Sequence, residues 1–153
     1  MKNIILVLMV VLGGNIMLSG CTKDEILGHY NHIIQLAGSA ELTGRLSLKG
    51  TKEKGVDDYT GSYEAEYNNF SNTEYLFGGT SIKREAGKDL SVTCTLKVTD
   101  GSAKVFWISG DEEPVVLIET TGVYDETITL SEGGNYIGIA GDNFTGSVNV
   151  SAR

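Results

Sequence analysis

Hydrophobic and polar side chains alternate along much of the chain after residue 41, most clearly over residues 90–98. The apolar side chains of this segment share one parity: Leu90, Val92, Cys94, Leu96 and Val98. The residues between them are serine, threonine and lysine. A period of two places one set on a buried face and the other in water, so the pattern predicts a β-strand. Cys94 is on the apolar side and is expected to behave as a small buried hydrophobic residue rather than as a reactive thiol.

Shorter patterns of the same kind predict further strands, separated by many of the 20 glycines of the chain. The expected strands are residues 42–48, 59–67, 74–82, 103–108, 115–119, 126–130, 135–140 and 144–150. Asp100 and Gly101 lie in a segment with the composition of a tight turn, so the chain is expected to reverse there. The charged residues 49–58 are expected to form a solvated loop. Roughly nine strands with short links predict an all-β fold, an antiparallel two-sheet sandwich of jelly-roll type.

Residues 24–37 depart from this pattern, because their apolar side chains recur with the period of a helix. Those on one helical face are Ile26, Leu27, Tyr30, Ile33, Ile34 and Ala37. Asn31, His32 and Gln35 fall on the opposite face. A short N-terminal helix is therefore expected between Asp24 and Gly38, and a strand through residues 32–36 is the alternative.

The first 20 residues have the pattern of a secretory leader. Lys2 is followed by an apolar run over residues 4–12, which is too short to cross a bilayer and has the length of a signal-peptide core. The leader ends in Leu18-Ser19-Gly20-Cys21, which resembles the lipobox of bacterial lipoproteins. The resemblance implies transfer of a diacylglyceryl group to the Cys21 thiol and cleavage between Gly20 and Cys21. It covers the leader alone.

Three regions follow from these patterns: a lipoprotein signal peptide over residues 1–20, a lipid-anchored segment over residues 21–41 and a β-sandwich domain over residues 42–153. The expected location is the extracytoplasmic face of a cell membrane, the outer membrane where the envelope has one, with the membrane as partner through lipidated Cys21. With Cys21 acylated, Cys94 has no cysteine to pair with, so stability is expected to come from packing. The closing segment from Gly133 onward also weakly resembles the last strands of bacterial secreted β-sandwiches.

The charge of the chain argues against nucleic acid as a partner. The formal net charge is −8, from 12 basic and 20 acidic side chains. Binding to phosphate backbones is driven by clustered lysine and arginine. The leader contributes one lysine and no acid, so the chain from Cys21 onward is more acidic still, and anionic lipid headgroups are expected to repel it.

Motifs that would identify a reaction are not found in the sequence. The two histidines, His29 and His32, are too few for a zinc site, which needs three or four ligands. No Gly-x-Ser-x-Gly elbow occurs, and a phosphate-loop spacing over residues 50–55 lacks the lysine that follows it in true loops. The acidic segments at residues 57–58 and 111–113 lack the spacing of known calcium loops and are expected to be solvated tips. No metal, no cofactor and no catalytic residue is predicted.

Aromatic side chains provide the candidates for a binding surface. Tyr59, Tyr63 and Tyr67 share one parity along a predicted strand, where an exposed row would stack on sugar rings. Polar residues fill the opposite parity, so the favoured interpretation is that the three tyrosines point inward.

The segment 103–119 is apolar on both parities. Trp107 and Phe106 point to opposite faces of the predicted strand, which belongs to a hairpin with residues 115–119. One face of this hairpin therefore needs a cover. The favoured cover is the apolar stripe of residues 24–37, and the alternative is an open face with Trp107 or Phe106 at the centre of a partner site.

The expected function is that of a non-catalytic binding module at the cell envelope, whose partner is an envelope protein or a glycan. Two alternatives remain: a small hydrolase or accessory subunit that acts on envelope polysaccharide, and a structural lipoprotein without a small ligand.

Overall fold

The computed structural model describes residues 42–80 and 84–153, and this part of the chain is built from β-strands without a helix. The strands are β1 Thr51–Lys54, β2 Gly61–Phe70, β3 Thr73–Gly79, β4 Asp89–Ser109, β5 Val115–Ile118, β6 Gly122–Thr129 and β7 Asn135–Ala152. All pairings are antiparallel, and the predicted all-β sandwich is confirmed. The predicted leader, Cys21, the segment over residues 21–41 that is expected to be lipid-anchored and the predicted helix lie outside the described residues.

Two long strands, β4 with 21 residues and β7 with 18, run antiparallel to each other through most of their length. Both bend at the same level, where the register shifts around Asp100. Gly101 has a positive φ of 67° at this bend, and a Cβ there would lie 2.2 Å from the carbonyl oxygen of Asn143 on β7. Asn143 itself has a φ of 47°. The two strands therefore turn together, as β-bulges allow.

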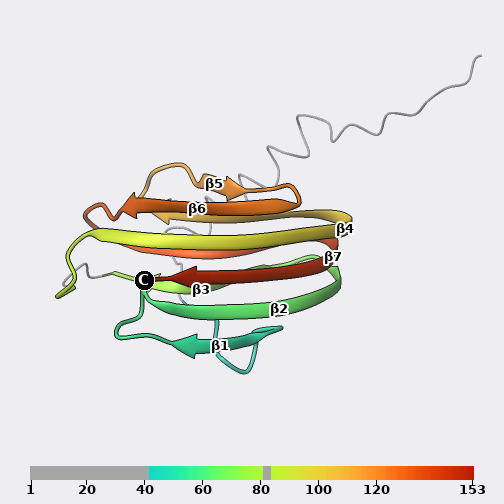
Figure 1. Cartoon of the computed structure of the whole chain (residues 1–153), viewed down its shortest axis with the longest axis horizontal. Coiled ribbons are helices and arrows are strands. Elements are labelled where there is room, and N and C mark those ends of the chain that lie inside the picture. The colour runs from blue at the N-terminus through green and yellow to red at the C-terminus, as the bar shows by residue number, and fades with distance from the viewer. Residues whose placement is uncertain (1–41, 81–83) are drawn as a thin grey trace, which may run out of the picture.

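The bend divides the hydrogen-bonded sheet into two layers that face each other. The first layer has the order β1–β2–β7–β4–β6 and uses the second half of β7 with the first half of β4. The second layer has the order β3–β7–β4–β5 and uses the other halves of the two long strands. This order is that of a jelly roll. Figure 1 shows β7 between β4 on one side and β2 and β3 on the other.

The main core fills the space between the layers. The first layer contributes the alternating side chains predicted from residues 90–98, with Leu90, Val92 and Cys94 fully buried. The second layer contributes Val105 and Ile139, which are also fully buried. Burial raises the pKa of the Cys94 thiol to about 12, so the thiolate that reactive cysteines need is suppressed at neutral pH.

The prediction of a tight turn at residues 99–102 is wrong. The chain does not reverse there, and the segments predicted as two strands of a hairpin are the two halves of β4. The same holds for residues 135–140 and 144–150, which are two halves of β7. Gly101 provides a bulge rather than a hairpin turn, because the partner of both halves is β7 and not the chain on the other side of the turn.

The strand expected over residues 42–48 is also wrong. Residues 45–47 form a turn, and Leu46 at its tip is fully exposed. The segment instead crosses from the edge of the second layer, where Thr43 bonds to Tyr75, toward β1 in the first layer.

Part of the loop expected over residues 49–58 is the short edge strand β1. Its Lys52 lies 5.1 Å from the ring centre of Phe77, so a lysine stem covers the margin of the core. Lysine on an edge strand also opposes pairing with other chains.

A second, smaller cluster lies on the outer face of the second layer, and we call it the outer cluster. Its members are buried: Tyr75, Phe106, Ile108, Tyr136 and Ala140. The ring of Phe106 lies over Gly138, where a Cβ would come within 2.7 Å of it, and meets Tyr75 edge to face at a centroid distance of 6.0 Å. The prediction that residues 103–108 are apolar on two faces is confirmed, with Val105 in the main core and Phe106 in the outer cluster.

Candidate functional site

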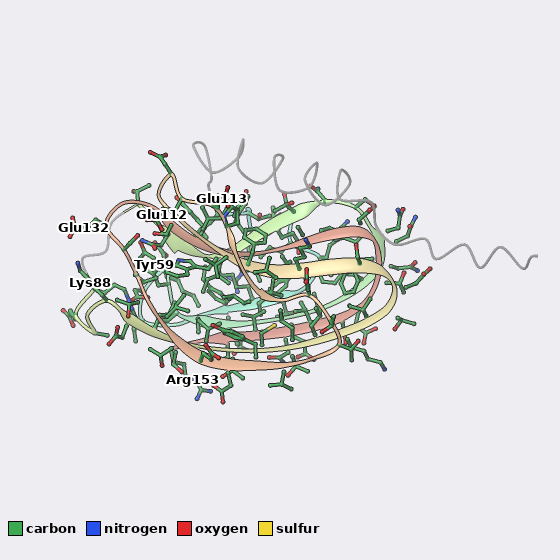
Figure 2. The ribbon with its side chains drawn as sticks, turned by 90° about the horizontal axis from the view of Figure 1, so that it is seen from above. Tyr59, Lys88, Glu112, Glu113, Glu132 and Arg153 are labelled. Atoms are coloured by element: carbon green, nitrogen blue, oxygen red, sulfur yellow. The ribbon has the colours of Figure 1, made fainter. Side chains whose placement is uncertain are left out.

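One end of the sandwich gathers most of the long connections. Four connections meet there with the end of β7, because the strand registers place the first residues of β2, β4 and β7 at this same end of the sandwich. These connections are residues 55–60, 84–88, 110–114 and 130–134. We call this the loop end. Figure 2 shows it at the left, where Lys88, Glu112 and Glu132 lie. Connecting loops on a rigid sheet are where binding residues of such folds are concentrated.

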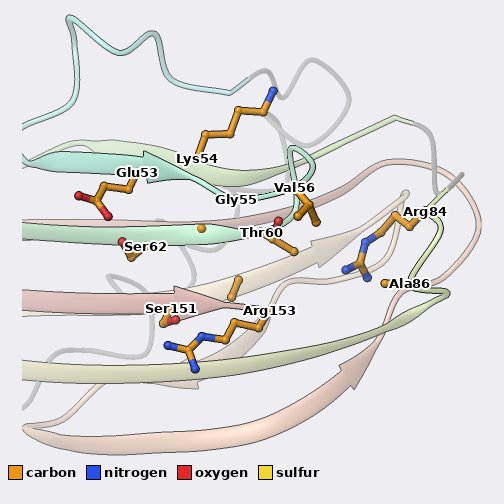
Figure 3. A pocket seen from close by; sticks show the side chains of 12 residues that line it. Glu53, Lys54, Gly55, Val56, Thr60, Ser62, Arg84, Ala86, Ser151 and Arg153 are labelled. Carbon is orange, nitrogen blue, oxygen red and sulfur yellow. The ribbon is translucent and has the colours of Figure 1, made fainter.

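A pocket of about 420 Å³ opens at the loop end beside the edge of the first layer. Figure 3 shows the side chains that line it, which come from β1, from the turn after β1, from the start of β2, from the segment of Arg84 and from the end of β7. Three cationic side chains line it (Lys54, Arg84 and Arg153), together with Glu53. The hydroxyl-bearing residues of its wall are Thr60, Ser62 and Ser151.

Arg84 is the most firmly held of these side chains, with 2% of its surface exposed. Its Nε donates to Asp57 Oδ2 at 2.9 Å, and its Nη1 donates to the carbonyl oxygens of Gly87 and Asp89 at 3.2 and 3.1 Å. The guanidinium carbon also lies 5.7 Å from the ring centre of Tyr59. These contacts set the rotamer of Arg84, so its charge is held at a fixed position in the wall of the pocket.

Asp57 is held as tightly as the arginine it faces. Its Oδ1 accepts from the backbone N–H of Tyr59 at 3.0 Å, and Thr60 Oγ1 accepts from the N–H of Asp57 at 3.2 Å, which closes the turn between β1 and β2. Burial pushes the pKa of Asp57 up, but the hydrogen bond and charge of Arg84 outweigh it, with help from Thr60 and Tyr59. The net pKa of Asp57 is therefore lowered.

The rim of the pocket is more open to water. Lys54 pairs with Asp58 at 2.8 Å, with both side chains more than half exposed, and Val56 at the tip of the turn is 91% exposed. An exposed pair of this kind contributes little to stability. The pocket thus combines a fixed cationic wall with a solvent-exposed charged rim and neutral hydroxyl donors, a lining suited to a small polar or acidic group.

A second pocket, of about 460 Å³, lies at the opposite end of the sandwich near the turn between β2 and β3. It is lined mostly by amide and hydroxyl side chains of residues 68–72, with Lys49, Glu66 and Tyr67.

Glu74, on β3, is a buried carboxylate in the main core. Its Oε2 accepts from the hydroxyls of Tyr63 at 2.8 Å and Tyr67 at 2.5 Å, and its Oε1 accepts from the N–H of Lys49 at 2.7 Å. Burial, followed for Tyr67 by its bond to Glu74, raises the pKa of both tyrosines far above the usual value. The network ties the crossing segment before β1 to the two layers, which gives it a structural role.

The tyrosines proposed from the sequence as a sugar-stacking row are all buried, as the favoured interpretation predicted. Tyr59, Tyr63 and Tyr67 are 4%, 0% and 4% exposed, so their rings are not available on a sheet face. Tyr59 nevertheless supports the pocket, since its ring lies beside Arg84 and its hydroxyl donates to the Gly79 carbonyl at 2.9 Å.

Trp107 and Phe106 lie on opposite faces of β4 and do not form one surface. Trp107 packs partly exposed against the main core, and its Nε1 donates to Asn135 Oδ1 at 3.2 Å. Asn135 in turn donates to the carbonyls of Ser131 and Gly133, which fixes the loop before β7. Phe106 is buried in the outer cluster.

The two acidic residues of the first segment considered for calcium are held in ion pairs. Asp57 and Asp58 pair with Arg84 and Lys54. Within residues 42–80 and 84–153, no three histidine, cysteine or acidic side chains come together in a group that could hold a metal ion. The same part of the chain contains no helix long and apolar enough to span a bilayer. His29 and His32 lie outside it.

The sequence reasoning missed Arg84 and Glu74, the two charged side chains on which the pocket and the crossing segment depend. Glu74 has a weak signal, because it shares parity with Leu76 in a predicted strand and so falls on the buried side. Arg84 lies between strands, and no periodicity marks such a residue.

Comparison with known proteins gives little further information. No family model and no curated protein matches the sequence. Among solved structures, Drosophila melanogaster CENP-C bound to CAL1 is 10% identical with a TM-score of 0.30, covering 85% of this chain and 99% of that one. The C-terminal CBM6 of LamC, a marine laminarinase from Zobellia galactanivorans, is 10% identical with a TM-score of 0.25. The match covers 68% of this chain and 89% of that one.

The pair between Asp57 and Arg84 is expected to stabilise the fold far more than the neighbouring pair between Asp58 and Lys54. Asp57→Ala leaves the buried guanidinium without its anion and is expected to lower the free energy of unfolding at pH 7 by about 1 to 3 kcal/mol. Asp58→Ala is the matched control, with an expected loss under about 1 kcal/mol. Urea unfolding of the three proteins measures both values.

The pH dependence of this difference follows from the lowered pKa of Asp57. A carboxyl with a lowered folded pKa contributes stability above its unfolded pKa of about 3.9, and that contribution is lost as pH falls through the folded pKa. The gap between wild type and Asp57→Ala should therefore shrink below about pH 4. A gap that is constant from pH 7 to pH 3, or an equal loss in Asp58→Ala, would contradict this assignment.

Proposed function

We propose that this protein is a binding module on a lipid anchor at the extracytoplasmic face of the cell envelope, and that its loop-end pocket takes a polar unit of an envelope or extracellular glycan. The observation that supports this most directly is Arg84, a buried guanidinium held by three hydrogen bonds in the wall of a pocket. Arg84 fixes a positive charge there, and the exposed cations Lys54 and Arg153 of the same pocket are proposed to donate to sugar hydroxyls or carboxylates.

The size of the pocket favours a small unit over a protein surface. About 420 Å³ falls within the range of small-molecule sites, whereas a stable protein partner requires a broad patch of about 800 Å² on each side. Since the three tyrosines of β2 and its preceding turn are buried, recognition is proposed to depend on hydrogen bonds and charge rather than on ring stacking.

The anchor is proposed from the lipobox-like end of the leader at Cys21. Two acyl chains hold a protein on a membrane durably, at about 0.8 kcal/mol per buried CH₂, whereas one chain binds marginally. The acidic body carries little attraction for anionic lipid, so the anchor is proposed to be the sole membrane contact.

Binding is tested on an array of neutral and uronic-acid-containing oligosaccharides and cell-wall fragments. Ser151 lines the pocket, while Ser147 lies on the same face of β7 away from it. Ser151→Trp should fill the pocket and weaken any binding at least tenfold, and Ser147→Trp should leave it unchanged. Arg153→Gln should weaken acidic ligands more than neutral ones.

The same samples distinguish the other functions. Release of shortened glycans would assign a hydrolase and overturn the binding module. Binding that Ser151→Trp and Ser147→Trp affect equally would place the site elsewhere. A lack of binding to every glycan at millimolar concentration would reject the glycan as ligand and favour an envelope protein or a structural role.

The anchor predicts a definite mass and a definite thiol count. The protein purified from a bacterial host should begin at Cys21 and carry acyl chains, and after unfolding it should show one free thiol, that of Cys94. Cys21→Ser should abolish acylation and release the protein from membranes. Two free thiols in the unfolded protein, or an unmodified Cys21, would contradict the anchor.

A further inference from the structure

The outer face of the second layer is buried to a degree that a sandwich face exposed to water does not show. Phe106 and Ile108 are each 1% exposed, and Tyr75 and Tyr136 are each 7% exposed. An antiparallel sheet of this kind normally buries one face and leaves the other in water. Within the described residues, the hydrophobic side chain that packs on the outer cluster in addition to its members is Leu42. One leucine does not cover three aromatic rings, each of which has about 150 to 250 Å² to bury.

We propose that residues 24–37 of this chain dock on the outer cluster and form its cover. The position of residue 43, which follows this segment in the chain, supports residues 24–37 as the cover. The N–H of Thr43 donates to the carbonyl of Tyr75 at 3.0 Å, and the N–H of Tyr75 donates to Thr43 Oγ1 at 2.8 Å. These two bonds hold the chain at the edge of the second layer, beside the cluster. The four residues 38–41 then span at most about 14 Å, so residue 37 is within reach of the cluster.

The chemistry of the segment matches that of the face. Its apolar side chains form one stripe, and as a helix of 14 residues it would be about 21 Å long, enough to cross a layer of four strands spaced about 4.8 Å apart. The face it would meet is dry. The hydroxyl of Tyr75 is buried without a hydrogen-bond partner among the described residues, and burial raises the pKa of Tyr75. A stripe of this composition suits such a face, because Tyr30 is its only member with a polar group that needs a partner.

Docking would also set the orientation of the β-sandwich and its distance from the membrane, a consequence that rests on the anchor proposed above. Thr22 and Lys23 alone would separate Cys21 from the docked segment, a reach of roughly 10 Å instead of the roughly 70 Å of a 20-residue tether. Ser62 and Ser151 of the pocket project from the outer face of the first layer, on the side of the sandwich opposite the outer cluster. The pocket would therefore face away from the side on which the anchored segment docks.

The test uses the full chain, purified from membranes in detergent, and matched pairs of substitutions. Ile33→Asp with Ile34→Asp changes the apolar stripe, and Asn31→Asp with Gln35→Asp adds the same two charges on the opposite face. Hydroxyl-radical labelling, mapped by mass spectrometry, reports the exposure of each tyrosine. Tyr75 and Tyr136 should be protected in wild type and in the opposite-face variant, and labelled at least tenfold more in the stripe variant. Tyr63 and Tyr67 should remain protected throughout, which shows that the sandwich is still folded.

Equal labelling of Tyr75 and Tyr136 in the stripe and opposite-face variants would overturn the proposal. Protection in wild type that disappears on dilution would do the same, because it would assign the cover to a second copy. A second measurement applies if the stripe variant unfolds. Ala140→Cys combined with Ile33→Cys or Ile34→Cys should form a disulfide, and combined with Gln35→Cys it should not. No disulfide with either stripe position would reject the docking. None of these results depends on acylation of Cys21. The docking proposal can therefore fail or hold independently of the proposed lipid anchor.

Discussion

The pairing of β4 with β7 is the constraint on which the rest of this structure depends. The two strands stay in register with each other on both sides of a shared bend, so each provides a central strand to both layers. Every other strand is added to this pair: β2 and β3 along β7, β6 and β5 along β4, and β1 outside β2. The two halves of the sandwich are thus joined by continuous backbone as well as by the core. A bend that failed at Gly101 or Asn143 would separate the layers.

Two buried polar contacts fix the connecting segments at the two ends of this sandwich. At the loop end, Arg84 and Asp57 fix the connections before β2 and β4 and form the wall of the pocket. At the opposite end, Glu74 with Tyr63 and Tyr67 holds the segment that crosses from one layer to the other. Both contacts put a charge in a place that packing alone would fill with apolar side chains, and in both the charge is satisfied by several donors or acceptors. Such contacts restrict the loops to one arrangement, which a binding pocket needs.

The sequence predicted the fold class because period-two alternation is clear in β2, in the first half of β4 and in the second half of β7. The parity of residues 90–98 identified the buried side of β4, and the parity of Tyr59, Tyr63 and Tyr67 identified the inward side of β2. The way in which the strands connect and pair was harder to predict from the sequence. Asp100 and Gly101 have the composition of a hairpin turn, and whether such a pair reverses the chain or bulges it depends on a partner strand some 40 residues away. Local patterns do not contain that information.

The same limit applies to the candidate site. The two apolar parities of residues 103–108 predicted that Trp107 and Phe106 lie on opposite faces of β4, as they do, but neither residue lines the pocket. Arg84 and Ser151, which line the pocket, are brought together by the long-range register of β2, β4 and β7 and carry no local signal. A pocket assembled from two connections and the ends of β1, β2 and β7 can be found only after the positions of those strands are known.

Native-state hydrogen exchange tests the central role of the β4–β7 pair most directly. Amides in residues 92–96 and in residues 105–108 of β4 should be among the slowest to exchange in the protein and should open with the same free energy, that of global unfolding. Amides of residues 84–88 at the loop end should open at a lower free energy. Two halves of β4 that open independently, with free energies that differ by more than about 2 kcal/mol, would contradict the account, because the two layers would then be separate units.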